Sequence, residues 1–268
     1  MSDRDKQPAR PDDDPAVRAL RDAAERGDLA ATEMLARRLW DAGDLTGAET
    51  WFRRAADRGS VAALGHLGEL AWQDGRIAEA LGWLERAAMT GRTAAEYQLG
   101  AMHLERGNLD AAERWLRKAA ETGLPEALCN MGALADRRGR DEEAEWWYER
   151  AARAGNPTGM RNLGLRLARR GEFDRAERLL VEAARRGRTD SLAVLGAAYL
   201  ELGRVTEAEA WLRRGADAGD AESMFQLALF LDGTEHPKPD AAQPESRTWL
   251  ERAAALGHPR ALDVLHDM

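Results

Sequence analysis

The residues best suited to catalysis are few in this chain, and they occur in none of the familiar catalytic spacings. No H-E-x-x-H pair or comparable metal-ligand spacing occurs among the five histidines, which are His66, His103, His236, His258 and His266. The sequence also lacks a G-x-S-x-G nucleophile elbow and a G-x-x-x-x-G-K-[ST] phosphate-binding loop. Cys129 is the single cysteine, so it forms no internal disulfide, and no base is evident for it in the sequence. These residues predict a non-enzymatic protein that uses no metal and no cofactor.

A second group of polar residues recurs every 32 residues and suits the binding of a peptide. Each precedes a Leu-Gly pair or its equivalent, and the series reads Met34, His66, Gln98, Asn130, Asn162, Val194, Gln226. A side-chain amide offers a donor and an acceptor together, so consecutive amides can hold one extended backbone without reading its sequence. The alternative is that these amides form hydrogen bonds to neighbouring helices.

Neighbouring positions of the same interval add apolar walls and positive charge. They are Tyr97 and Arg161 one residue before the amide position, Leu165 three residues after it, and Arg137 and Arg169 seven residues after it. We expect the three arginines and the two asparagines to meet in a local positive spot on an acidic protein. Because arginine pairs a carboxylate bidentately, an acidic side chain or a peptide C-terminus is the preferred guest. Tyr97 and Leu165 would supply apolar walls.

The elements that position these side chains belong to a structural repeat, because three further series of residues recur at the same 32-residue interval. One is Gly27, Gly59, Gly91, Gly123, Gly155, Gly187 and Gly219. A second is Gly43, Gly75, Gly107, Gly139, Gly171 and Gly203. A third is Trp51, Trp83, Trp115, Trp147 and Trp211, with Leu179 in the missing slot. Three series in one register predict an array of identical supersecondary units.

Each unit is predicted to contain two helices that end at glycine. The first carries a small residue, Leu and Gly on one face, as in Ala95-x-x-x-Leu99-Gly100. The mid-unit glycine ends it. The second is expected to begin with a capping box such as Thr46-x-x-Glu49, or its variant Asp110-x-x-Glu113. The tryptophan series is predicted to form the core between repeats rather than an aromatic cage or a ladder for bases. For Trp40 and Trp72 two roles stay open, a hot spot on the concave face or a cover for the end of the stack.

The repeats give the expected layout of the chain. Residues 1–13 are charged and contain proline, so we expect a disordered tail. Residues 14–268 form one all-α solenoid, with a half repeat at 15–27, seven full repeats at 28–257 and a capping helix at 258–268. The longer seventh repeat places a loop at 233–244, which is either a tolerated surface loop or a contact site.

The charge of the chain narrows the classes of partner. Lys+Arg number 39 against 47 Asp+Glu, which gives a net charge of −8. This balance disfavours nucleic acid and a polybasic membrane anchor. No apolar run approaches the ~18 residues that cross a bilayer. The first residues, MSDRDKQPARPDDDP, lack the apolar core of a signal peptide, so we expect a cytoplasmic protein.

The repeat resembles the tetratricopeptide repeat superfamily, and within it the Sel-one-like branch. The patterns that carry the resemblance are small-x-x-x-Leu-Gly in the first helix and Ala-x-x-Trp-x-x-x-Ala-Ala-x-x-Gly in the second, illustrated by Gly75-Arg76 and Ala87-Ala88-x-x-Gly91. They extend from residue 15 to the end, although the short turn between helices is closer to ordinary tetratricopeptide repeats. The resemblance implies a right-handed α-solenoid whose first helices line the concave face, and adaptor or scaffold roles.

The resemblance also places a ligand on that concave face. Asn130 and Asn162 match the family's asparagine ladder for extended peptides, and Gln98 and Gln226 are longer variants. The family's lysine-based carboxylate clamp is not reproduced. The predicted peptide-binding groove consists of His66, Gln98, Asn130, Asn162, Gln226, Tyr97, Arg137, Arg161, Leu165 and Arg169.

The leading functional prediction is a non-enzymatic protein-interaction scaffold or adaptor that binds a peptide segment. The alternative is a receptor for a short signalling peptide that regulates a separate output protein. An RNA-binding array that reads one base per repeat is disfavoured by the acidic charge. We expect a monomer or a weak end-to-end dimer, since the last helix would cap the stack incompletely.

Overall fold

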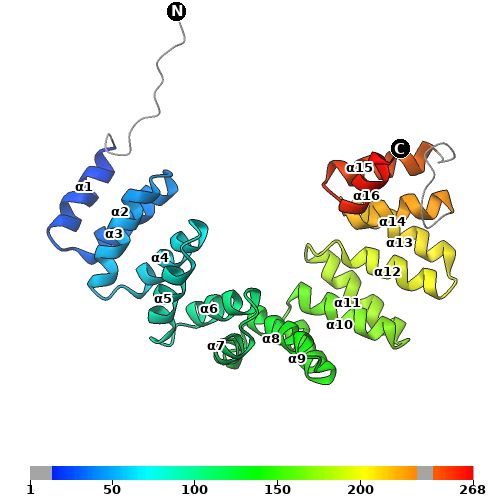
Figure 1. The fold of residues 1–268 in the computed structure, drawn as a ribbon, viewed down its shortest axis with the longest axis horizontal. Coiled ribbons are helices and arrows are strands. Elements are labelled where there is room, and N and C mark those ends of the chain that lie inside the picture. Colours follow the sequence, from blue (N-terminus) through cyan, green and yellow to red (C-terminus); the bar gives the residue numbers. More distant parts are fainter. Residues whose placement is uncertain (1–13, 234–243, 268) are drawn as a thin grey trace, which may run out of the picture. The chain divides into compact units, whose positions relative to one another are not determined.

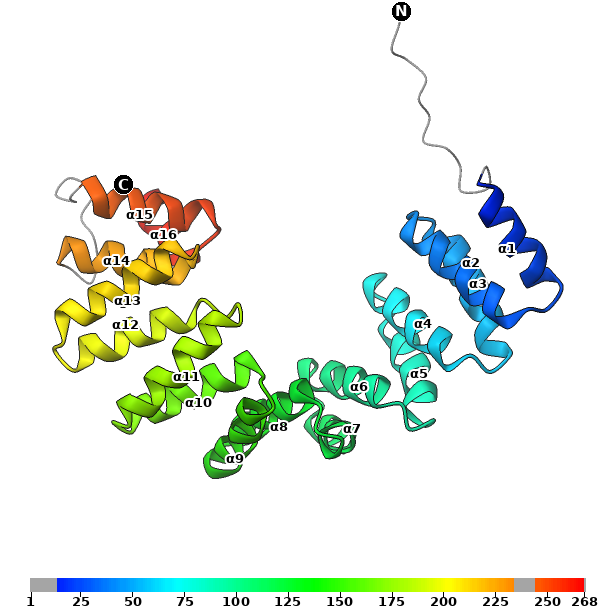
Figure 2. The same cartoon turned by 180° about the vertical axis from the view of Figure 1, so that it is seen from behind.

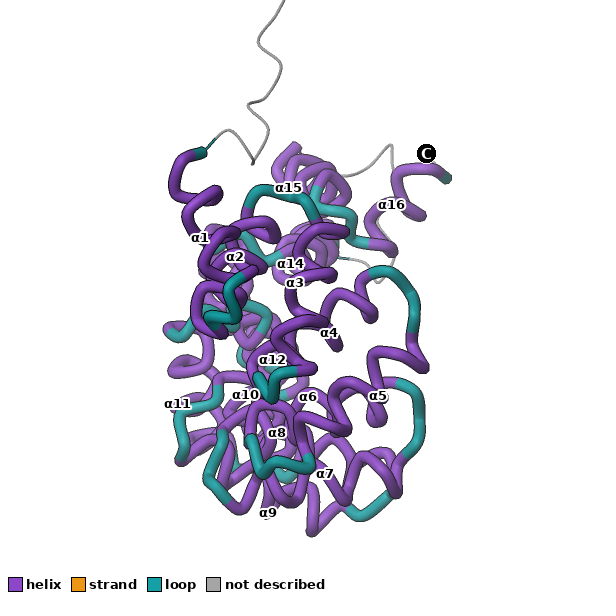
Figure 3. The backbone as a smooth tube through the Cα atoms, turned by 90° about the vertical axis from the view of Figure 1, so that its left-hand side faces the viewer, coloured by secondary structure: helices purple, strands orange, loops and turns teal. Residues whose placement is uncertain are grey.

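The computed structural model describes residues 14–233 and 244–267, and this part of the chain is helical without any strand (Figure 3). The predicted tail at 1–13 and nearly all of the predicted loop at 233–244 lie outside the described residues. The chain divides into two compact units, Met1–Thr122 and Gly123–Met268, which are described separately. Within each unit, every helix packs against the next one along the chain (Figures 1 and 2).

Each unit is an array of helices about three turns long. Unit 1 contains α1 (Pro15–Glu25), α2 (Leu29–Asp41), α3 (Leu45–Asp57), α4 (Val61–Gln73), α5 (Ile77–Ala88), α6 (Thr93–Glu105) and α7 (Leu109–Glu121). Unit 2 contains α8 (Pro125–Arg137), α9 (Asp141–Arg153), α10 (Pro157–Arg169), α11 (Phe173–Arg185), α12 (Ser191–Glu201), α13 (Val205–Asp217), α14 (Ala221–Asp232), α15 (Pro244–Ala255) and α16 (Pro259–His266). Even-numbered helices are the predicted first helices, and odd-numbered helices are the predicted second helices.

The glycine series end the helices as predicted. Gly59 follows α3 with φ 90°, and Gly75 follows α4 with φ 72°. Both values lie in the left-handed region, which costs a glycine little because it has no Cβ. The other turn glycines of the two series share this conformation. Each 32-residue repeat therefore contains two reversals of the chain, one at a glycine of each series.

The predicted capping boxes are wrong. α3 begins at Leu45, and its cap is Asp44, whose Oδ1 accepts the backbone N–H of Gly47 at 2.9 Å. Thr46 lies inside the first turn and is too late to cap the helix. The reason is the tightness of the turn, because the residue directly after the glycine already occupies the cap position. At α7 that residue is Asn108, which makes no side-chain capping bond.

The tryptophan series belongs to the core, as predicted. Three of its five members are buried, namely Trp51, Trp115 and Trp147, and so is Trp249, which the sequence-based series did not include. Trp83 and Trp211 are half-buried. A cation from the next helical turn covers each ring, as Arg54 does at 4.4 Å from the Trp51 centroid. Trp40 is half-buried and lies edge-on to Phe52 and His66, with centroids 5.8 and 5.3 Å away.

Glycines inside the first-type helices let the paired helices approach closely. A Cβ placed on Gly68 would lie 2.6 Å from Cγ of Leu84, and one on Gly164 would lie 2.7 Å from Cγ of Leu180. These glycines are the second residue of each Leu-Gly pair. The motif therefore records a packing requirement between the two helices of a repeat.

Candidate functional site

The first-type helices of unit 2 line two adjoining hollows. One, of about 460 Å³, lies among residues of α8, α9 and α10, and the other, of about 500 Å³, lies among residues of α10, α12 and α14. Leu165 and Arg169 of α10 line both hollows, so the two adjoin at these side chains. We call these two hollows the groove of unit 2.

The structure brings only some of the predicted site residues into this groove. Asn162 lines the first hollow, Arg161 and Gln226 line the second, and Leu165 and Arg169 line both. Asn130 and Arg137, although on α8, line neither.

In unit 1, two predicted residues lie together. His66 and Gln98 line a separate hollow of about 150 Å³ between α4 and α6, and Tyr97 does not line it. Burial lowers the pKa of His66, so its imidazole is neutral at pH 7.

The prediction of a local positive charge is wrong for the groove as a whole. Arg161 forms an ion pair with Asp190 at 2.9 Å, and Arg166 pairs with Asp136 and with Asp141. These acidic residues were missed because none of them occupies a repeat position that predicted the site: Asp136 lies on α8, Asp141 on α9 and Asp190 at the cap before α12. Carboxylates outnumber guanidinium groups along both hollows. The lining is therefore mixed in charge and mostly self-neutralised.

Arg169 is the exception in this lining. Its side chain is exposed where the two hollows join, and it forms no ion pair within residues 14–233 and 244–267. Arg170, the next residue, is engaged differently, since Nη1 and Nη2 donate to the two oxygens of Glu145 at 2.7 and 2.8 Å. Arg169 is thus available to pair with a carboxylate that comes from outside.

The predicted amides have different environments. Oδ1 of Asn162 accepts a hydrogen bond from Nη1 of Arg161 at 3.4 Å. Nε2 of Gln226 donates to Oε1 of Glu222 at 2.7 Å, one turn earlier on the same helix. Oε1 of Gln226 is buried without a partner in the described part of the protein. An unpaired buried acceptor is costly, and a donor from a ligand would satisfy it.

Sequence reasoning missed Tyr148, which forms part of the wall of the first hollow. It occupies the column that holds Leu84, Leu116 and Leu180 elsewhere, and its ring packs over Gly132. Its hydroxyl donates to Oδ2 of Asp136 at 2.7 Å. Burial and this hydrogen bond raise the pKa of Tyr148, while a hydrogen bond with Asn162 acts in the opposite direction. The only signal in the sequence was that a tyrosine stands at a repeat position where most other repeats have leucine.

Cys129 on α8 is buried, and burial raises the pKa of its thiol to about 11. Because the thiolate is the reactive form, we expect the folded protein to react with a maleimide at pH 7.5 at least tenfold more slowly than the urea-unfolded chain, whose thiol has a pKa of ~8.5. Mass spectrometry follows the reaction at this single cysteine. Equal rates for the folded and unfolded protein would contradict the burial of the thiol.

Comparisons with known families agree with this architecture. Models described as tetratricopeptide repeat match residues 34–97, 93–118 and 161–222. A model described as Sel1 repeat matches residues 125–156 and 221–258. No match was found among curated protein sequences. None of the described helices combines the length and the apolar character that crossing a membrane requires.

Solved structures with the same arrangement of helices include a Sel1 repeat protein from Oxalobacter formigenes, with 28% identity, a TM-score of 0.63, and coverage of 82% of this chain and 98% of that one. The protein c5321, a protective antigen present in uropathogenic Escherichia coli strains, is 25% identical with a TM-score of 0.51, and the match covers 91% of this chain. This match spans only 65% of the c5321 chain.

Yeast Tom70 is similar in fold alone, with 16% identity, a TM-score of 0.63, and coverage of 93% of this chain and 56% of Tom70. The paired helices, the glycine turns and the family matches lead to one conclusion. This chain belongs to the tetratricopeptide repeat superfamily and is a Sel1-like repeat protein.

Proposed function

We propose that this protein is a non-enzymatic scaffold or adaptor that binds a peptide segment of a partner protein in the groove of unit 2. Repeats of these two families generally mediate protein–protein interaction and typically serve as non-catalytic scaffolds. The observation that carries the proposal is that two hollows among helices α8 to α14 adjoin at Leu165 and Arg169.

The shape and lining of the groove suit an extended main chain. The second hollow is lined by small side chains of α12, among them Ala193 and Ala197, which let a backbone lie close to the helix. Leu165 supplies apolar surface for a side chain of the guest. The buried Oε1 of Gln226 is an acceptor without a partner in the described residues, and a peptide N–H is a suitable donor for it.

The charges favour a guest with one acidic residue rather than an acidic tract. Arg169 provides one cation that no described carboxylate neutralises, and arginine binds a carboxylate through two parallel hydrogen bonds. Glu201 and Glu222 line the same hollow and would repel further acidic side chains. The guest therefore pairs one carboxylate with Arg169 and presents neutral or basic residues on either side.

A selection from a random peptide library tests this proposal. Phage displaying random 12-residue peptides are selected on the wild-type protein, and the binding of the selected peptides is then measured by fluorescence anisotropy. We expect selected peptides to share one acidic residue, and Arg169→Glu to weaken binding by at least tenfold, or ~1.4 kcal/mol. Raising the salt concentration should weaken the wild-type complex, because the pair is partly exposed to solvent.

The matched control is Arg178→Glu on the second-type helix α11, where the arginine is also exposed and unpaired within the described part of the chain. It makes the same change in net charge and should bind the selected peptides as the wild type does. Circular dichroism establishes that both variants remain helical. Equal binding by Arg169→Glu and wild type would refute the assignment of the groove.

A further inference from the structure

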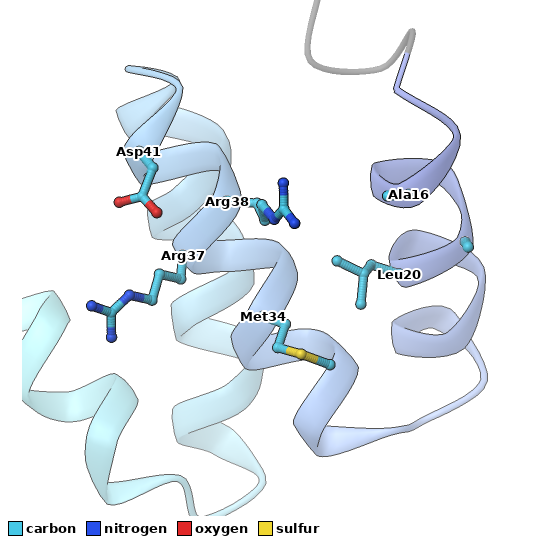
Figure 4. A pocket seen from close by; sticks show the side chains of 7 residues that line it. Ala16, Leu20, Met34, Arg37, Arg38 and Asp41 are labelled. Atoms are coloured by element: carbon cyan, nitrogen blue, oxygen red, sulfur yellow. The ribbon is translucent and has the colours of Figure 1, made fainter.

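The first described helix leaves an apolar hollow of about 540 Å³ against the second. Its lining comes from one side of α1 and one side of α2, and consists of Ala16, Ala19, Leu20, Met34, Arg37, Arg38 and Asp41. Figure 4 shows Leu20 pointing from α1 toward α2, and Met34 and Arg38 pointing from α2 toward α1. Met34 is 52% exposed, so a large apolar side chain of this hollow is open to solvent.

The repeat pattern identifies the kind of element that would cover this hollow. α1 is a second-type helix, and Leu20 stands 64 residues before Leu84, in the column that packs against the close-approach glycine of a first-type helix. Successive first-type helices also contact one another, as α10 does with α12 and α12 with α14. A first-type helix placed before α1 would therefore contact both α1 and α2. No such helix precedes α1 in the described part of the chain.

A first-type helix with an uncovered face occurs at the other end of the array. α16 begins after the cap residue His258 and carries Leu262, which is 48% exposed. The equivalent residues of α4, α8 and α14, Leu64, Leu128 and Met224, are buried, and each of these helices packs against the second-type helix of its own repeat. No described helix covers Leu262 in this way.

Each surface carries charges that suit the other, beside Asp41 in the lining of the hollow and Arg260 on α16. Arg37 and Arg38 border the hollow, and both are exposed. Asp263 and Asp267 lie on α16 and at its end, and both are exposed as well. None of the four forms an ion pair within the described residues. Opposite charges around two apolar surfaces favour their association and fix its orientation.

The chain's own N-terminal residues are a poorer occupant by composition. Residues 1–13 contain no Leu, Ile, Val, Phe or Trp, and seven of the thirteen are Asp, Arg or Lys. Such a segment offers little apolar surface to fill a hollow of this kind. α16 offers both leucines and carboxylates.

We propose that the hollow between α1 and α2 receives α16 of a second copy of this protein, head to tail. In this contact α16 is the first-type helix and α1 is the second-type helix of one repeat shared between two molecules. The two surfaces are different, so the contact is heterologous, and each molecule keeps one free hollow and one free α16 for further copies. The stacking of repeats inside each unit thus continues from one molecule to the next.

The same columns indicate that this contact is weaker than those within a unit. The close-approach position is Gly in α4, α6, α8, α10 and α12 and Ala228 in α14, but it is His266 in α16. A side chain of that size keeps α16 farther from Leu20 than α4 lies from Leu84. The association should therefore appear only as protein concentration rises.

Complementation between two surface variants tests the proposal. Met34→Glu blocks the hollow and Leu262→Glu blocks α16, and both changes affect exposed side chains, so both proteins should keep wild-type circular dichroism. In sedimentation velocity between 5 and 500 µM (on the order of the range in which weak contacts of this kind form), we expect the mass of the wild type to rise beyond that of a dimer. Each variant alone should stay monomeric, whereas their mixture should form a 1:1 dimer and nothing larger.

The control is Met89→Glu, an equally hydrophobic and more exposed position outside both surfaces, which should associate as the wild type does. A wild type that stays monomeric over the whole range overturns the proposal. So does a mixture of monomeric variants that fails to form dimers, because that result indicates a symmetric interface. Association that appears only after removal of residues 1–13 would assign the hollow to the chain's own tail and would likewise overturn it.

Discussion

Replacing Trp147 with alanine is expected to lower the free energy of unfolding by about 3–5 kcal/mol, and the same change at the adjacent Trp146 by less than about 1 kcal/mol. Both residues are tryptophans on helix α9, and both contact the Arg150 side chain. Its guanidinium carbon lies 4.7 Å from the Trp146 centroid and 5.0 Å from the Trp147 centroid. They differ in burial, because Trp147 is 5% exposed and Trp146 is 51% exposed. The alanine at 147 leaves a cavity within the repeat core.

Urea unfolding followed by circular dichroism measures this difference, since the helical signal does not depend on the tryptophans themselves. Repeat arrays gain stability from local and nearest-neighbour contacts, so hydrogen exchange along α9 and its neighbours should localise the loss. Trp146→Ala serves as the internal control for helix propensity. Similar losses for the two variants would contradict the placement of the tryptophan series in the core.

The helical array could be predicted from the sequence because its signals are local and repeated. A glycine that must adopt positive φ recurs at every reversal of the chain. The tryptophan series that begins at Trp51 marks one core position in each repeat. Each of these residues is constrained by its own helix and the next one, so short-range patterns were sufficient. The failure at Thr46 has the same local origin, since a shift of two residues at a tight turn moves a side chain from the cap into the first turn.

The groove was less predictable because its character depends on residues from different types of helix. The repeat positions that predicted Arg161 and Arg169 all lie on first-type helices. They contain no information about the acidic residues of α9 that line the first hollow, which are Asp141, Glu142 and Glu145. Tyr148 likewise reaches Asp136 only because α9 packs closely over Gly132. Acidic side chains from a neighbouring helix can neutralise a cluster of arginines, and they need not recur at the 32-residue interval of the sequence.

Gly100→Ala and Gly82→Ala are expected to change stability in opposite directions, although both place alanine inside a helix of unit 1. A Cβ on Gly100 would lie 2.7 Å from Cγ of Leu116 and 2.9 Å from its backbone nitrogen. The side chain could rotate, but the backbone of α7 could relieve the contact only by moving away. Overpacking of this kind costs about 1–3 kcal/mol. A Cβ on Gly82 of α5 meets no atom within 4 Å, so the higher helix propensity of alanine should stabilise by about 0.5–1 kcal/mol.

The pair separates two reasons for glycine in a repeat helix, because propensity favours alanine at both positions and only close packing opposes it. Urea unfolding of the two variants beside the wild type gives both signs under the same conditions. If Gly100→Ala proved as stable as Gly82→Ala, α6 and α7 would not approach as closely as the structure places them. The Leu-Gly pairs would then be a feature of composition rather than of packing. A destabilised Gly100→Ala would make the same glycine a packing requirement in α4, α8, α10 and α12, where the equivalent Cβ also falls within 3 Å of the neighbouring side chain.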